Sequence, residues 1–169
     1  MNPASKMIVR TALFLALAVL FPVVFHQFGM GGRIFLPMHI PVLLAGFLGG
    51  PISGIVVGLL APAASFALTG MPPTYAVPLM SLELCLYGLT AGLFYYRLRM
   101  NILIALVISL VLGRVGFAVG LLVLGLFIQL PYGIGTYFSV AVVAGIPGII
   151  IQLVFIPPIV AAVMRRERR

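Results

Sequence analysis

Acidic side chains are almost missing from this sequence. Of its 169 residues only two are Asp or Glu, against ten Lys or Arg, and charged residues make up 7% of the chain. One of the two acids, Glu83, nevertheless lies within the apolar stretch VPLMSLELCLYGLTAGLFYYRLR at 77–99. So few titratable groups are a poor basis for acid–base catalysis, and we do not expect an enzyme.

Cysteine and histidine are equally scarce. The single Cys85 lies in an apolar run, which excludes a disulfide framework and a cysteine metal site. His26 and His39 are distant from each other in the sequence, and no pairing of a nucleophile with a base is recognisable. The sequence therefore predicts neither a metal site nor a cofactor.

What the sequence has in abundance is apolar residues. They account for 63% of the chain, and the mean hydropathy is +1.30. A soluble domain of this length has too little interior to hide so much apolar surface, which places the chain in a bilayer. The net charge of +8 comes from basic residues separated by apolar spans, without a continuous basic face. We interpret them as topology signals and expect no nucleic acid partner.

The apolar runs predict an all-α integral membrane protein with six transmembrane helices in one domain, residues 1–169. Each helix needs about 20 residues to cross a hydrocarbon core of ~30 Å, or fewer where other parts of the protein shield its ends. The first run is too long for a signal peptide and is expected to be retained. The expected helices are 7–25, 37–49, 51–68, 76–96, 102–128 and 137–164.

Basic residues orient these helices. With six spans, the bases at both termini and those at 97–99 fall on one side, whereas Arg33 lies in a loop on the other side and Arg114 lies within a span. The positive-inside rule then places both termini in the cytoplasm.

Two stripes of small residues predict how the helices pack. Ser81, Cys85, Gly88 and Gly92 share one face of the helix 76–96, and the helix 102–128 carries a similar stripe, at 109, 113, 116 and 120. Small residues allow helix backbones to approach closely in lipid.

The opposite face of the helix 76–96 is polar. Glu83 and Tyr87 are four residues apart and so lie on one side of the helix. A carboxylate within a bilayer costs on the order of 3 kcal/mol or more and needs a partner or water. Arg114 is the one basic residue inside a span and is a suitable partner for Glu83. Two interpretations stay open: a structural buried pair, or charges that line a solute cavity.

Other candidate residues lie near the loops opposite the termini. His39 either forms a local hydrogen bond or lines the same cavity. Tyr75 and Tyr132 are interfacial anchors or part of a lid over a ring-shaped solute. The remaining polar candidates are Arg33, Gln129 and Gln152.

The segments FLPMHIPVLLAGFLGGPISGIVVGLLAPAASFALTGMPP and LMSLELCLYGLTAGLFYY resemble the substrate-binding S components of energy-coupling factor (ECF) transporters. The similarity covers nearly the whole chain in span count, topology and size. It implies a high-affinity subunit in the plasma membrane (the inner membrane where there are two) that binds a vitamin or related micronutrient from outside. It also implies partners, namely a transmembrane T subunit and two cytoplasmic ATPases.

The resemblance further implies a docking face. S components often carry an Ala-x-x-x-Ala pattern on the first helix for contact with the T subunit, and Ala12 and Ala16 fit it here. The absence of a phosphate-binding loop agrees with a binder that depends on separate ATPases. The alternative is an autonomous carrier or channel that uses Glu83 and His39 for proton coupling.

Overall fold

A computed structural model describes residues 2–27, 32–127, 135–136, 143 and 145–167, and this part of the chain is helical without strands. Five of its helices are long and apolar enough to cross a membrane. The all-α prediction is therefore confirmed for the described residues. The elements in chain order are α1 (Pro3–Gln27), α2 (Gly32–Phe35), α3 (His39–Thr69), α4 (Ala76–Gly92), a π-helix (Leu93–Arg97), α5 (Ile102–Phe127) and α7 (Ile146–Glu167).

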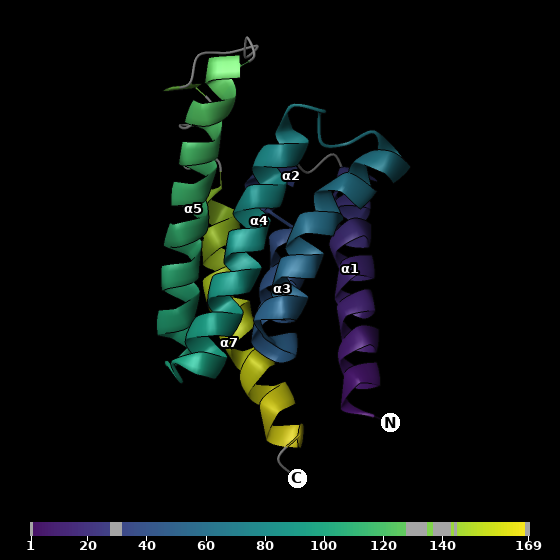
Figure 1. Ribbon diagram of the computed structural model, residues 1–169, viewed down its shortest axis with the longest axis vertical. Coiled ribbons are helices and arrows are strands. Elements are labelled where there is room, and N and C mark those ends of the chain that lie inside the picture. Colours follow the sequence, from purple (N-terminus) through teal and green to yellow (C-terminus); the bar gives the residue numbers. More distant parts are fainter. Residues whose placement is uncertain (1, 28–31, 128–134, 137–142, 144, 168–169) are drawn as a thin grey trace.

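The expected helices 37–49 and 51–68 correspond to the two limbs of α3, which begins at His39 and is sharply bent at Gly50. The backbone there has φ 84° and ψ 177°, a conformation that glycine adopts without a steric penalty. Gly46 and Gly54, on either side of the bend, both pack against Gly88 of α4. From there the second limb runs back along α4, so that Gly58 meets the backbone beside Cys85. Figure 1 shows this return of the chain toward the upper end of the bundle.

The first limb of α3 is short. At 1.5 Å per residue it spans ~16 Å, about half of a bilayer core. The two limbs of α3 together count as one of the five candidate spans, although the chain direction changes at Gly50 as the sequence predicts.

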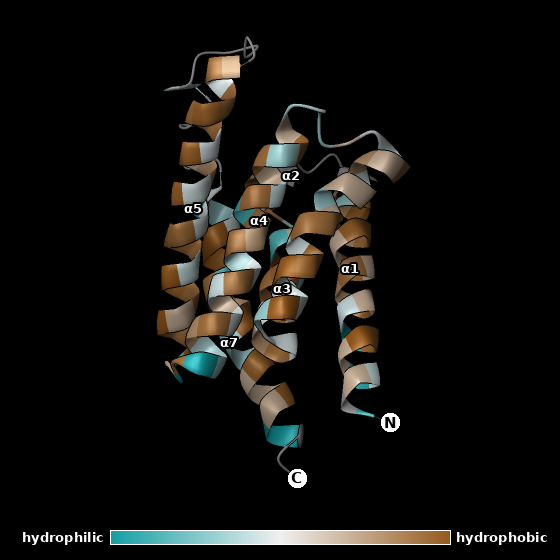
Figure 2. Cartoon of the chain, in the orientation of Figure 1, coloured by the Kyte–Doolittle hydropathy of each residue, from teal (hydrophilic) through white to brown (hydrophobic). Residues whose placement is uncertain are grey.

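The helix α4 occupies the middle of the bundle. It packs on α3 and on α5, while α1 covers the outside of α3 and α7 contacts α2, α3 and α5. In Figure 1, α1 and α5 lie at opposite edges of the bundle. Figure 2 shows hydrophobic residues over most of the visible helix surface, as expected of a membrane protein. Polar groups of α4 are thus enclosed between α3 and α5.

Both chain ends lie at the same end of the bundle (Figure 1). The Gly50 bend is at this end too, because Leu48 contacts α1 and the π-helix there. The Leu48 carbonyl oxygen accepts hydrogen bonds from Arg10 Nη1 at 3.4 Å and from the Tyr96 hydroxyl at 3.3 Å. A helix break in an apolar environment leaves carbonyls that need such donors.

The interface between α3 and α4 is built from the predicted small residues. Gly54 and Gly88 approach so closely that a Cβ on either one would collide with the backbone of the other. Gly92 packs in the same way on Pro51, and the Ser81 hydroxyl donates to the Leu59 carbonyl at 3.2 Å. The prediction that this stripe is a packing face is confirmed.

Some helix bounds differ from the expected ones. The helix α1 begins at Pro3 rather than at residue 7, and the expected helix 76–96 is divided into α4 and the π-helix. The last helix, α7, begins at Ile146; residues 137–142 and 144 of the expected helix 137–164 lie outside the described residues.

Candidate functional site

Glu83 of α4 and Arg114 of α5 form an ion pair inside the bundle. Arg114 Nη1 lies 2.9 Å from Glu83 Oε1, and the two side chains are 15% and 3% exposed, respectively. The contact that the sequence suggested between these residues is present. An ion pair so removed from water needs further hydrogen bonds to offset the loss of solvation of both charges.

Tyr87, one turn after Glu83 on the same helix, supplies one of these bonds. Its hydroxyl donates to Glu83 Oε1 at 3.0 Å, and its side chain is fully buried. The aromatic ring lies against Gly113 of α5, where any Cβ would overlap the ring. Sequence reasoning assigned Gly113 to helix packing only. Its position immediately before Arg114 was the available signal that it makes room for the polar network.

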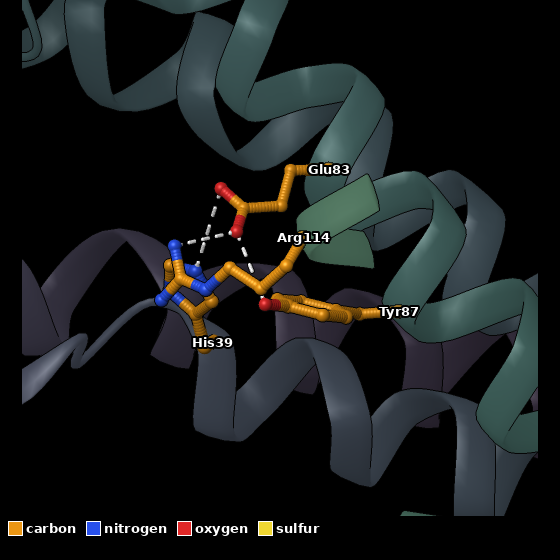
Figure 3. A network of polar contacts seen from close by, with 4 residues as sticks. All are labelled: His39, Glu83, Tyr87 and Arg114. Carbon is orange, nitrogen blue, oxygen red and sulfur yellow. Dashed lines mark hydrogen bonds and ion pairs between the residues drawn. The ribbon is translucent and has the colours of Figure 1, made fainter. Parts of the chain in front are cut away.

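His39, the first residue of α3, completes the cluster. Its Nε2 lies 3.9 Å from Glu83 Oε2, and its ring centroid is 5.3 Å from that of Tyr87. The structure therefore places His39 beside Glu83. Figure 3 shows the four side chains converging from α3, α4 and α5, with Glu83 as the shared partner. We call His39, Glu83, Tyr87 and Arg114 the polar network.

Several buried atoms of this region lack a hydrogen-bond partner among the described residues. They are Nδ1 and Nε2 of His39, and Nε and Nη2 of Arg114. The side-chain nitrogen and oxygen of Gln152 on α7 are in the same condition, and this residue is fully buried. An unsatisfied buried polar group costs about 1–3 kcal/mol. The network can therefore accept a ligand that supplies hydrogen-bond acceptors and donors.

Two of the remaining predicted site residues, Tyr75 and Arg33, belong to the described part of the chain. Tyr75 is half-buried at the N-terminus of α4, and its side chain or backbone takes part in a non-covalent interaction. The backbone of Arg33 belongs to α2. Gln129 and Tyr132 lie outside the described residues, and their predicted roles stay predictions.

The predicted docking residues lie on the outside of the bundle. Ala12 and Ala16 are exposed on α1, whereas Phe14 and Ala18 of the same helix are buried. The helix thus turns one side toward α3 and leaves Ala12 and Ala16 uncovered by the described part of the chain.

The polar network offers hydrogen-bonding groups rather than an unpaired charge or a metal site. Its two ordinarily charged groups are already paired, and among the described residues no cluster of three or more His, Cys, Asp or Glu could hold a metal ion. The atoms still able to form hydrogen bonds are the nitrogens of His39 and Arg114 that lack partners among the described residues. Hydrogen bonds are directional, so such atoms select a ligand by shape and polarity.

The family model described as "ECF transporter, substrate-specific component" matches residues 6–160. The chain belongs to this family. The S component is a substrate-specific subunit of a transporter, and the family is not a class of enzymes. Five apolar helices agree with a multi-pass membrane protein. The comparisons with curated proteins and with solved structures give no match.

Proposed function

We propose that this S component is the high-affinity substrate-binding subunit of an ATP-dependent importer for a vitamin or related micronutrient. It resides in the plasma membrane and crosses it six times, with the two limbs of α3 counted as separate crossings and both termini in the cytoplasm. The position of both chain ends at one end of the bundle supports an even number of crossings.

The observation that carries the binding role is the incomplete polar network. A purely structural ion pair in lipid is expected to have all its donors satisfied, because unsatisfied groups are costly there. Here the Arg114 guanidinium keeps Nε and Nη2 buried without partners among the described residues. A bound substrate is the natural partner for these atoms. Glu83, Tyr87, His39 and Arg114 form the centre of the site, with Gln152, Arg33, Tyr75, Gln129 and Tyr132 as its further residues.

Transport then requires an energy source in other subunits. We propose that a transmembrane T subunit and two cytoplasmic ATPases supply it and that Ala12 and Ala16 form the docking face for the T subunit. Exposure of both alanines on α1 supports this assignment, since small side chains admit a second helix at close range.

Uptake by reconstituted protein tests the proposed function. The small molecule that co-purifies with the protein is identified by mass spectrometry, radiolabelled and offered to proteoliposomes with and without the T subunit and ATPases. We expect ATP-dependent uptake only in the presence of these subunits. Uptake by the S component alone, driven by a proton gradient, would instead establish the autonomous carrier.

The docking face has its own test. Ala16→Trp should leave substrate binding by the isolated protein near normal and strongly reduce uptake by the complex, because the indole fills the space for the partner helix. Leu122→Trp, at a residue of α5 that is 54% exposed, is the matched control and should not affect uptake. Equal uptake by both variants would reject Ala16 as a docking residue.

The orientation is tested by labelling in intact cells. In a Cys85→Ala background, a cysteine at exposed Thr74 should react with an impermeant thiol reagent, whereas one at exposed Asn101 should not. Reaction at residue 101 would contradict the cytoplasmic termini and the even number of crossings.

A further inference from the structure

The free edge of Arg114 has a defined geometry. Nη1 is engaged by Glu83, so that the atoms without partners, Nε and Nη2, are the two donors on the lateral edge of the guanidinium. These two N–H bonds are nearly parallel. Such a fork fits two acceptor atoms side by side, as in a carboxylate or phosphate, or in a ring where a carbonyl oxygen lies next to an unprotonated nitrogen.

Charge balance distinguishes these ligands. Glu83 and Arg114 lie 2.9 Å apart and cancel each other's charge. A carboxylate or phosphate on the free edge would add a buried negative charge without a counter-charge, beside a carboxylate that is only 3% exposed. Burial of an uncompensated charge is strongly unfavourable. An uncharged ring satisfies the same two donors and preserves the neutrality of the network.

Two further side chains can complete the contacts of such a ring. The His39 ring nitrogens have no hydrogen-bond partner in the part of the chain that the structure describes, and the imidazole lies beside the Tyr87 ring. Gln152 follows Gly148 by one turn of α7, and Gly148 packs on the backbone of residues 34–35 and on the Leu36 side chain, shortly before His39. This register places Gln152 at about the depth of His39. Its buried amide offers an NH2 group that donates and an oxygen that accepts, which suits a ring whose polar edge carries both acceptors and donors.

We propose that the substrate enters the network as an uncharged, oxo-substituted nitrogen heterocycle, with adjacent oxygen and nitrogen acceptors on the Nε–Nη2 edge of Arg114. This inference rests on the proposed function, since it names the chemical class that the binding subunit selects. Any anionic group of the substrate lies away from the network.

Matched pairs of small molecules test this class. Pterin and pterin-6-carboxylate share one ring system and one pair of adjacent acceptors, and cytosine and 5-carboxycytosine share another such pair on a smaller ring. Binding of each compound to the purified protein in lipid nanodiscs is measured by competition and by thermal shift. We expect the uncharged member of a pair to bind about tenfold or more tightly than its carboxylate, which corresponds to ~1.4 kcal/mol.

Glu83→Gln sharpens the test because it leaves the guanidinium without its counter-charge. In this variant the preference should move toward the carboxylate by about tenfold, whereas Ser81→Ala, on the side of α4 that faces α3, should leave it unchanged. If Glu83→Gln does not fold, the ratio for the wild-type protein decides alone. The proposed class is overturned if the carboxylates bind more tightly to the wild-type protein, if neither uncharged ring binds, or if a folded Glu83→Gln keeps the original preference.

Failure of this inference differs from failure of the proposed function. A carboxylate that binds through Arg114 and is imported only with the ATPases would reject the uncharged class and support the binding subunit. Absence of ATPase-dependent uptake of the co-purifying molecule would reject the role as a transporter subunit. It would do so whatever the ratio of affinities between an uncharged compound and its carboxylate.

Discussion

The two sides of α4 differ in how completely their interactions are satisfied. Toward α3, Gly88 and Gly92 bring backbones into contact, and the one hydroxyl of this stripe, on Ser81, has its hydrogen bond. Toward α5, the same helix carries Glu83 and Tyr87. Arg114, the ion-pair partner of Glu83, keeps two buried nitrogens without an acceptor among the described residues.

Under the proposed function, the two sides of α4 have different roles: the side toward α3 stabilises the bundle, and the side toward α5 binds substrate. Close packing and satisfied hydrogen bonds stabilise a helix pair in lipid, so the α3 side holds the bundle together. Unsatisfied buried donors destabilise the free protein by about 1–3 kcal/mol each. Under the proposed function, the bound substrate satisfies them. Substitutions on the two sides should therefore affect different measurements.

Gly88→Leu should have the largest effect on stability. A Cβ at this position overlaps the backbone of Gly54, so that the helices must separate. Overpacking of a core commonly costs about 1–3 kcal/mol, and contact with backbone, which yields less than a side chain, should exceed this. Thermal unfolding in detergent should reveal little or no folded protein. Gly135→Ala, at a glycine with nothing within 4 Å of the added methyl group, is the control and should unfold like the wild type. Wild-type stability of Gly88→Leu would contradict the packing role of this side.

Glu83→Gln and Arg114→Gln should each weaken binding of the co-purified substrate, with a moderate loss of stability. Each removes one charge of a pair whose other contacts are incomplete, and we expect a decrease of ~1–3 kcal/mol in the free energy of unfolding. A decrease of about 3–5 kcal/mol together with normal substrate affinity in the folded fraction would identify a structural ion pair instead. Chemical unfolding and isothermal titration with the co-purified molecule distinguish the two.

Tyr87→Phe should have the smallest effect. It removes one hydrogen bond to Glu83 and keeps the ring against Gly113, so that we expect a loss of ~1 kcal/mol and a several-fold weaker affinity. Ser109→Ala is the control, because this buried hydroxyl donates to the Ala105 carbonyl within its own helix. If Ser109→Ala weakens substrate binding as much as Tyr87→Phe does, the effect of Tyr87 is general and not specific to the network.

Sequence alone predicted the parts that follow from periodicity. The spacing of Gly88 and Gly92 identified a packing face, and Glu83 in an apolar run required a buried partner, for which Arg114 was the one base inside a span. The separation of the expected helices 37–49 and 51–68 also placed a turn at residue 50.

Other features depend on distances that a sequence does not contain. His39 is 44 positions before Glu83, and only the bend of α3 together with its packing on α4 brings the two within 3.9 Å. Which guanidinium nitrogen of Arg114 meets Glu83 depends on side-chain conformation, yet this detail determines the free edge.

The central claim, that the polar network binds substrate, is tested most directly by the double variant Glu83→Gln/Arg114→Gln. Removal of both charges leaves neither one buried alone, so the variant should lie within about 1 kcal/mol of the wild type in stability. The decisive measurement is ATPase-dependent uptake of the co-purified molecule by cells that express this variant with its partner subunits. Our account predicts a folded protein that does not transport. Wild-type uptake by the folded double variant would show that Glu83 and Arg114 serve only each other.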